Sequence, residues 1–354
     1  MSTKITTNVT NLPDSRVEIK VTIPYEMITK HRGEALKNLG ETLKIDGFRA
    51  GHIPESVILE KVGETGLLAE MADRALTEHY STIITESKTQ PISRPEISLT
   101  KLAPENDVEF VITSDVMPTI KLPDVAKIAK KQNTEPVETT ITDEEFEKAI
   151  KEVRQMRAHD KMHEDGVEHH DHNHQNIPDE ELPELDEAMI KSLGNFENVE
   201  DFKAKFKENL IKEKERAAQE KNRLSIIESI IAEGTFEIPT SMIDFELDRM
   251  LEQFKHDLAM SGMKIEEYLG HIGKTIEDIR TEWKDQAKKR VQTQLSLEKI
   301  AEQFSITPDQ AKIDEQVNQM KEMYKDQVDE ANLVMYVTQM MTNTAVFEWL
   351  ESQK

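Results

Sequence analysis

Residues 47–54 read Gly47-Phe48-Arg49-Ala50-Gly51-His52-Ile53-Pro54, and they lie between two segments whose apolar residues recur at helical spacing. The two glycines allow backbone conformations with φ > 0, and Pro54 suits the first turn of the helix that follows. Such a loop can hold the ring of Phe48 and the guanidinium of Arg49 in water, where neither serves a core. Two interpretations are open at this point: a plain helix–helix turn with one exposed ring, or a docking loop.

The segments around this loop predict a compact α+β domain. Three of them alternate apolar and polar residues as half-buried strands do: 17–23, 97–99 and 108–112. Between the first and second strands, helical spacing predicts one helix from Pro24 to Leu43, a short helix around 57–59 and a longer one over 68–83. Strands at both ends with helices between them describe an α+β domain over residues 1–118.

The next segment, 119–162, begins as a linker. Prolines at 118, 123 and 136 predict an extended chain over residues 119–141. A helix then begins at Thr142, which forms a capping box with Glu145. We expect this helix to pack with the C-terminal part of the chain.

A bridge rich in His and Asp follows over residues 163–181. Six of the 11 histidines lie between His159 and His174, and the segment has almost nothing to bury, so we expect it to be disordered. Imidazoles and carboxylates at this density could bind zinc, nickel or copper loosely. The candidate ligands are His169, His170, His172 and His174. A metal-binding or metal-storage protein built on residues 159–174 is therefore one alternative, and a solvated, pH-sensitive linker is the other.

Residues 182–354 predict an elongated all-α domain, because apolar residues recur at helical spacing almost throughout. Asn198 can cap a long helix that is apolar at its ends and polar over residues 212–223, as in a helix that projects. Further amphipathic helices follow Pro239, Thr275 and Pro308. We find no repeat of fixed period.

Composition excludes several classes of protein. The chain of 354 residues has 32% charged residues and no cysteine, which excludes disulfides, thiol catalysis and zinc fingers. No apolar run reaches the roughly 20 residues that span a bilayer, and the N-terminus lacks the apolar segment of an export signal, so we expect a cytoplasmic protein. Residues 1–131 hold 17 basic against 19 acidic side chains, and the rest hold 28 against 50. Since an acidic body repels nucleic acid, contact with an RNA-rich partner falls to the N-terminal part.

The stretch at 47–54 resembles the signature Gly-Phe-Arg-x-Gly-x-x-Pro of the trigger factor family. Residues 181–186 and the Ile238-Pro239 step into the next helix resemble two further landmarks of that family, in the same order. The resemblance implies an ATP-independent, ribosome-associated chaperone that shields nascent polypeptides. It also implies docking on the large subunit near the exit tunnel, through Gly47, Phe48, Arg49, Gly51 and Pro54.

Two departures from the family pattern stand out. Most members carry a prolyl isomerase domain of roughly a hundred residues, similar to FK506-binding proteins, where this chain has only the short bridge. An isomerase of that kind needs several aromatic side chains, and Phe146 is the sole Phe, Tyr or Trp between residues 131 and 186. We therefore predict neither catalytic residues nor a cofactor, and no isomerase activity. Many members also have basic residues where Ala50 and His52 stand, so ribosome affinity here should be lower or more dependent on pH.

Methionines provide the candidate contacts for clients. Nine of the 16 lie from Met242 onward, and their flexible side chains suit a surface that accepts many sequences. The candidates are Met250, Met260, Met263, Met320 and Met340. Filling gaps between helices is the alternative role for each.

The resemblance leaves a homodimer of the free chain open. Two other rivals are a periplasmic holdase, which would need an export signal, and a metal-dependent enzyme, whose ligands would need supporting partners.

Overall fold

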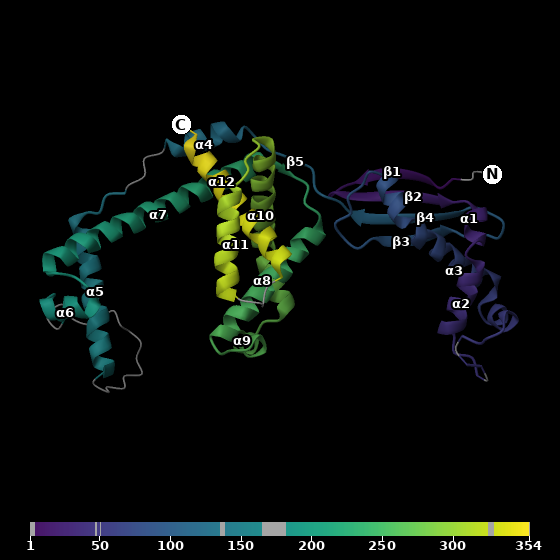
Figure 1. Cartoon of the computed structure of the whole chain (residues 1–354), viewed down its shortest axis with the longest axis horizontal. Coiled ribbons are helices and arrows are strands. Elements are labelled where there is room, and N and C mark those ends of the chain that lie inside the picture. Colours follow the sequence, from purple (N-terminus) through teal and green to yellow (C-terminus); the bar gives the residue numbers. More distant parts are fainter. Residues whose placement is uncertain are drawn as a thin grey trace. The chain divides into compact units, whose positions relative to one another are not determined.

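The computed structural model describes residues 4–46, 48–49, 51–134, 139–164, 182–324 and 329–353 (Figure 1). The chain forms two compact units, each made of two segments. The first unit comprises Met1–Pro123 with Glu233–Gln303, and the second comprises Asp124–Ala232 with Phe304–Lys354. Within the described ranges, the helices are all too short or too polar to cross a membrane.

The first unit contains a four-stranded antiparallel sheet in the order β1-β2-β4-β3 (Figure 1). The strands are β1 (Thr6–Leu12), β2 (Arg16–Ile23), β3 (Glu96–Lys101) and β4 (Val108–Asp115). Ile19 of β2 is paired with Ile112 of β4, and both side chains are buried on the same face. The alternation in the sequence therefore predicted β2, β3 and β4. It did not reveal β1, whose edge strand reads Thr-Thr-Asn-Val-Thr-Asn-Leu and is mostly exposed.

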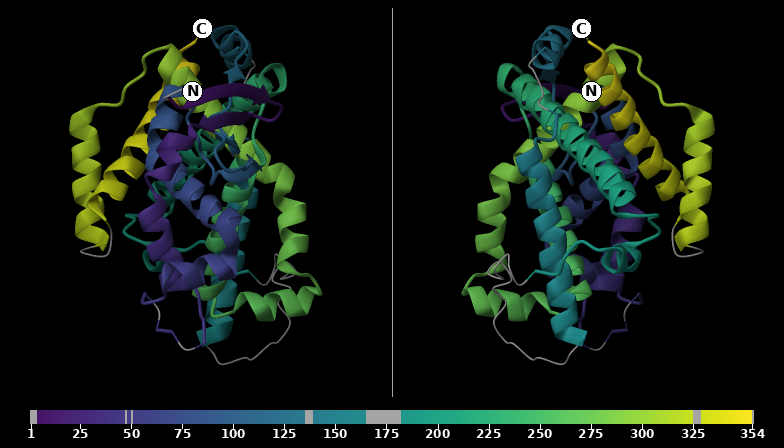
Figure 2. Two further views of the ribbon diagram at one scale, coloured as in Figure 1. Left: turned by 90° about the vertical axis from the view of Figure 1, so that its right-hand side faces the viewer. Right: turned by 90° about the vertical axis from the view of Figure 1, so that its left-hand side faces the viewer.

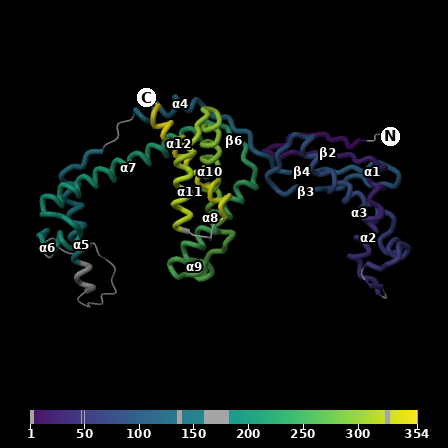
Figure 3. The backbone as a smooth tube through the Cα atoms, viewed as in Figure 1, coloured from purple at the N-terminus to yellow at the C-terminus, as the bar shows by residue number. Residues whose placement is uncertain are grey.

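Helix α3 (Glu55–Glu86) packs on one face of this sheet, and α1 (Tyr25–Thr29) and α2 (Arg32–Thr42) pack against α3 (Figure 3). Their core contains Ile28, Ala35, Leu68, Ala72, Leu76 and Ile83 against the buried side chains of β2 and β4. The chain bends at Lys30 and His31, so the single helix predicted from Pro24 to Leu43 is two helices. Gly63, with φ 72°, kinks α3 into two parts, which agrees with the two helices predicted there.

The rest of the first unit is a helical assembly of α8 (Thr240–Met260), α9 (Ile265–Ile272) and α10 (Ile276–Gln303). A short ladder between β5 (Ile120–Lys121) and β6 (Thr235–Phe236) lies beside it. One apolar cluster joins α8 to α10 through Leu247, Ala287, Val291 and Leu295. A second joins both helices to α9 through Leu251, Ile265, Leu269 and Ile279.

The second unit is entirely helical in the described residues: α4 (Val125–Asn133), α5 (Asp143–Glu164), α6 (Glu187–Leu193), α7 (Val199–Glu233), α11 (Gln310–Tyr324) and α12 (Glu330–Ser352). Helix α4 corrects the prediction of an extended chain over 119–141. Asp124 caps α4 by accepting a hydrogen bond from the Lys127 N–H at 3.1 Å, and Val125, Ile128 and Ala129 are buried. Two of the three prolines therefore delimit this helix rather than prevent it, since Pro123 precedes the cap and Pro136 follows the end in the sequence.

An aromatic cluster holds α5, α6 and α7 together. Phe202 and Phe206 stack with ring centroids 5.4 Å apart, and Phe146 of α5 lies 6.2 Å from Phe206. The capping box at the start of α5 is confirmed, since Thr142 and Glu145 exchange hydrogen bonds of 2.9 and 3.2 Å. The predicted disordered bridge, 163–181, lies outside the described residues from 165 onward.

Candidate functional site

The loop after α2 has a fixed base. The backbone becomes extended at Leu43, and the chain turns back before Pro54, which precedes α3. Gly51 donates its N–H to the Gly40 carbonyl at 2.8 Å and has φ 80°, a conformation that favours glycine. Ile53 is buried. The loop is therefore held at its base by the Gly51 bond and the buried side chain of Ile53, and two more backbone hydrogen bonds lie within the loop itself.

The tip presents Phe48 and Arg49 to solvent. Phe48 is 42% exposed, and Arg49 is exposed without an ion pair to any described residue. The arginine at the start of α2 is engaged instead: the Arg32 Nη2 lies 2.7 Å from the Glu55 Oε1. Gly47 and Ala50, which the sequence also placed in this loop, lie outside the described residues.

This pair of side chains suits recognition of a partner rather than catalysis. An aromatic ring can enter an apolar depression, while a guanidinium can form two parallel hydrogen bonds with a carboxylate or a phosphate. Aromatic residues and arginines are the residue types most enriched among those that dominate the energy of protein interfaces. The loop thus offers a compact anchor for another macromolecule.

A second kind of surface lies on α8 and the turn after it. Phe245 is 66% exposed and Met260 is 78% exposed. A shallow cavity of about 590 Å³ lies beside Phe245, and its lining includes Arg249, His256 and Arg290. An apolar ring bordered by both charged and polar groups can contact an unfolded chain without requiring one sequence. The sequence missed Phe245, because it lies off the apolar stripe of Ile243 and Leu247.

A third apolar surface lies on α12, which forms a hairpin with α11 (Figure 2). The hairpin has a small core of Ile313, Val317, Leu333 and Val337. Outside it, five apolar side chains are exposed on the two helices: Met323 at 73%, Met335 at 67%, Tyr336 at 59%, Val334 at 38% and Met340 at 36%. The signal in the sequence was that α12 carries apolar residues on every side, more than a hairpin can bury.

The C-terminal end of α12 is held firmly by α4 and α7. The Asn133 amide donates to the carbonyl oxygens of Leu350 and Gln353, at 2.9 and 2.8 Å. Arg223 donates two hydrogen bonds to the Glu351 carboxylate, and these bonds raise the pKa of the guanidinium. The apolar surface of α12 is therefore carried by a helix that is anchored at one end.

The five methionines that the sequence suggested as contacts for clients lie in different environments. Met260 and Met340 are exposed, and Met263 is half-buried. Met320 is half-buried against the core of the α11–α12 hairpin. Met250 is 7% exposed and packs between α8 and α10, so gap filling, the alternative role, describes it better. The structure thus favours Met260 and Met340 as surface contacts.

The described residues offer no group of three or more His, Asp or Glu side chains that could hold a metal ion. His169, His170, His172 and His174 lie outside those residues. The metal-binding alternative consequently has no support from the residues that the structure describes.

Comparisons with known proteins indicate one family and its fold. A family model described as bacterial trigger factor protein matches residues 5–153, and one described as its C-terminus matches residues 198–354. A trigger factor of Halalkalibacterium halodurans is 26% identical, with 84% of this chain and 85% of the relative covered. That of Carboxydothermus hydrogenoformans is 24% identical, over 90% and 91%.

A solved structure reported under the words "Promiscuous Substrate Recognition in Folding and Assembly Activities of the Trigger Factor Chaperone" shares the fold. Its TM-score is 0.53 at 16% identity, with 98% of this chain and 100% of that chain covered. The expected fold, a small α+β N-terminal domain followed by a long helical region, is confirmed. Because the two family models together span most of the sequence, the chain belongs to the bacterial trigger factor family.

Proposed function

We propose that this chaperone docks on the large ribosomal subunit near the exit tunnel through Phe48 and Arg49, and shields nascent polypeptides with its exposed helical surfaces. As a member of the trigger factor family, the chain is a ribosome-associated molecular chaperone. The docking assignment depends on one observation: an exposed ring and a guanidinium without an ion pair to any described residue lie side by side in the sequence of a loop whose base is fixed. We expect the protein to work in the cytoplasm, beside translating ribosomes.

Docking needs both side chains of the tip. Phe48 supplies an apolar anchor, and Arg49 supplies charge-assisted hydrogen bonds to a carboxylate of the ribosomal partner. Gly51 and Pro54 set the path of the loop, and by position Gly47 belongs to the same set. Truncating a desolvated anchor of this type typically costs about 2 kcal/mol or more in binding free energy.

The test replaces Phe48 and Arg49 together by Ala and measures co-sedimentation with ribosomes. We expect binding to be lost while helicity and the melting temperature stay unchanged, because neither side chain serves the core. The matched control replaces Arg216 and Leu224 by Ala, which removes one exposed guanidinium and one exposed apolar side chain from α7. The assignment is wrong if the loop variant sediments with ribosomes as the control does.

Clients would be held without ATP, by burial of their apolar side chains against exposed methionines and aromatic rings. The supporting observation is that Phe245, Met260, Met335 and Tyr336 are each more than half exposed. Flexible thioethers can adapt to many sequences, so one surface can serve many clients. The homodimer of the free chain stays a prediction.

We further propose that this member of the family is not a prolyl isomerase. The two family models leave residues 154–197 between them, which is fewer than the roughly 50 residues of the smallest typical domains. Part of that interval already belongs to the ends of α5 and to α6, which pack on α7. No separate catalytic domain fits into what remains.

A further inference from the structure

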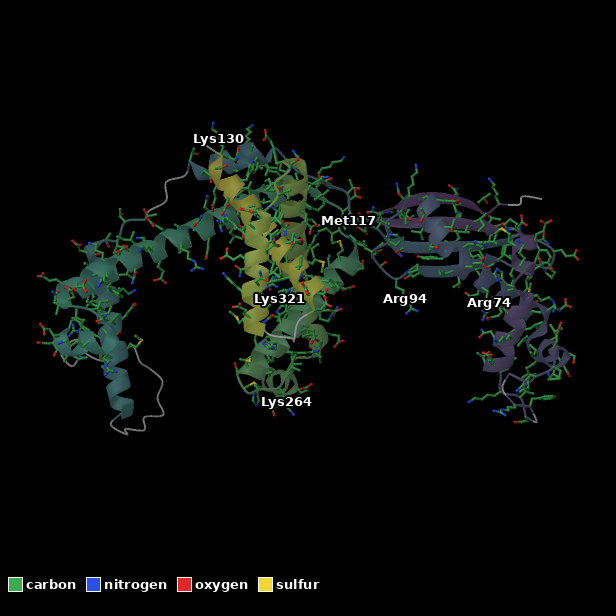
Figure 4. All side chains as sticks on the ribbon, in the orientation of Figure 1. Arg74, Arg94, Met117, Lys130, Lys264 and Lys321 are labelled. Atoms are coloured by element: carbon green, nitrogen blue, oxygen red, sulfur yellow. The ribbon has the colours of Figure 1, made fainter. Side chains whose placement is uncertain are left out.

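Helix α4 divides its residues into an apolar face and a cationic face. Val125, Ile128 and Ala129 are buried. Lys127, Lys130 and Lys131 are exposed, and their spacing of three and four residues places them on one side of the helix. Together they occupy about 6 Å of helix axis. Figure 4 marks this helix with the Lys130 label.

The ion pairs of the described residues do not include the three lysines of this face, although they include several lysines of other helices. None of them forms an ion pair with a described residue, and residues 125–134 contain no acidic side chain. By contrast, Lys212, Lys255 and Lys299 lie 2.6 to 2.7 Å from the carboxylates of Glu208, Glu252 and Glu302, on their own helices. With its Asp124 cap, α4 still carries three lysines against one carboxylate, in a chain whose formal charge is −24.

Helix stability explains only part of this arrangement. Lys130 and Lys131 lie in the last turn, where cations interact favourably with the helix dipole. Lys127 lies in the first turn, where the same dipole disfavours a cation. The interaction with the helix dipole therefore does not explain a lysine at position 127.

Tertiary contacts hold the cationic face in place. The Asn133 amide donates to carbonyl oxygens at the end of α12, and the Gln132 amide donates to the Ser229 hydroxyl of α7 at 3.2 Å. Both ends of the helix are therefore fixed, the N-terminal end by the Asp124 cap. The three ammonium groups are carried on a rigid support rather than on a mobile tail.

We propose that Lys127, Lys130 and Lys131 form a contact surface for the phosphate backbone of RNA. Lysine is a point charge that binds phosphate without reading bases, and this face carries no aromatic side chain for stacking. An acidic polypeptide fits less well, since α4 exposes no apolar side chain to hold it. The source of the RNA, the ribosome surface, rests on the function proposed above.

Ribosome affinity should be measured from 50 to 300 mM salt with the full chain and with a variant in which all three lysines are Gln. Each phosphate contact contributes about 0.7 to 0.9 to the slope of log affinity against log salt, so three contacts predict a loss of about 2 to 2.7. The matched control replaces three other lysines by Gln: Lys212, Lys255 and Lys299. It changes the net charge by the same amount and should keep the wild-type slope. Replacing the α4 lysines by Arg should restore it.

A second measurement separates this proposal from docking by the loop. Binding of the ribosome-free chain to poly(U) RNA should weaken in the α4 variant and stay unchanged in the variant with Ala at positions 48 and 49. Polyglutamate and vesicles with anionic lipid are the competing ligands. The proposal is overturned if the α4 variant keeps both the wild-type salt slope and its poly(U) affinity, or if α4 prefers polyglutamate or vesicles to poly(U).

Discussion

Gly51 donates its backbone N–H to the carbonyl oxygen of Gly40 at 2.8 Å, and this bond ties the returning arm of the loop to the last turn of α2. Gly40 is itself buried, with the Ile58 side chain 3.5 Å from where a Cβ would lie. A Cβ at either position would make only an ordinary van der Waals contact, so the need for glycine here is conformational and lies at Gly51, with φ 80°. The orientation of Phe48 and Arg49 depends on the bond between Gly51 and Gly40, although neither side chain takes part in it.

Replacing Gly51 by Ala should weaken ribosome binding. At φ 80° an L-residue is strained by about 1 to 2 kcal/mol, so the loop either stores that strain or moves its tip. We expect affinity to fall by up to a factor of about 5 to 30, measured by co-sedimentation. Gly33→Ala is the control: this helical position has open space around it, and Ala should leave docking intact and stabilise α2. Equal affinities of the two variants would contradict the role given to Gly51.

Replacing Met335 and Tyr336 by Ser should reduce the protection of clients from aggregation. Both side chains are more than half exposed, so the change removes apolar contact area without opening the hairpin core. Light scattering of a chemically unfolded client at a fixed ratio of chaperone to client measures the effect. The control replaces Met156 and Leu224 by Ser, which removes two similarly exposed side chains from α5 and α7. It should have little effect on the protection of the client. If both variants protect equally, α12 is not a client surface.

The chain should not accelerate prolyl isomerisation. Phe146 is the sole Phe, Tyr or Trp between residues 131 and 186, and it packs in the cluster of α5 and α7 rather than lining a site. We expect the cis–trans isomerisation of a proline-containing test peptide to proceed at the uncatalysed rate, with a time constant of about tens to hundreds of seconds at 25 °C. Acceleration proportional to chaperone concentration, and retained after repeated purification, would refute this expectation.

The start of α5 should loosen in acid. The hydrogen bond from Lys214, followed by that from the Thr142 N–H, lowers the pKa of the Glu145 carboxyl in the folded state. Because the folded pKa lies below the unfolded value of about 4.3, the stabilisation is complete above that value and disappears as pH falls through the folded pKa. Hydrogen exchange of the first amides of α5 between pH 6 and pH 3 measures the loss.

The variant Glu145→Gln should remove this pH dependence, and Lys214→Met should shift it toward higher pH. Both variants keep the length of the side chain close to the original. An exchange profile that is identical in all three proteins would show that the contact between Glu145 and Lys214 does not stabilise α5.

Several elements followed from local chemistry. Residues 17–23 alternate so regularly that β2 could be placed residue by residue, and Thr142 with Glu145 identified the start of α5. The loop at 47–54 could be singled out as a docking candidate because its residues resemble the signature of the trigger factor family, whereas local chemistry alone also allowed a plain turn. Each of these features depends on residues that are near neighbours in the chain.

Other elements were hidden by the same reasoning. Helix α4 was predicted to be a linker because three prolines lie close to it in the sequence. The end of α12, to which α4 is hydrogen-bonded, lies about two hundred residues away in the sequence. Strand β1 has little apolar signal, since it is held by backbone pairing with β2. Met250 was offered as a contact for clients, and only the packing of α8 on α10 shows that it is buried.

By itself the sequence determined strands β2 and β4, the start of α5 and the family, because these depend on spacing, on local capping and on short motifs. Tertiary structure decided which apolar side chains remain outside a core, and which lysines form ion pairs. The physical reason is that exposure and pairing are properties of surfaces brought together from distant parts of the chain. A helix such as α12, apolar on every side, does not show in its own residues which side will be covered.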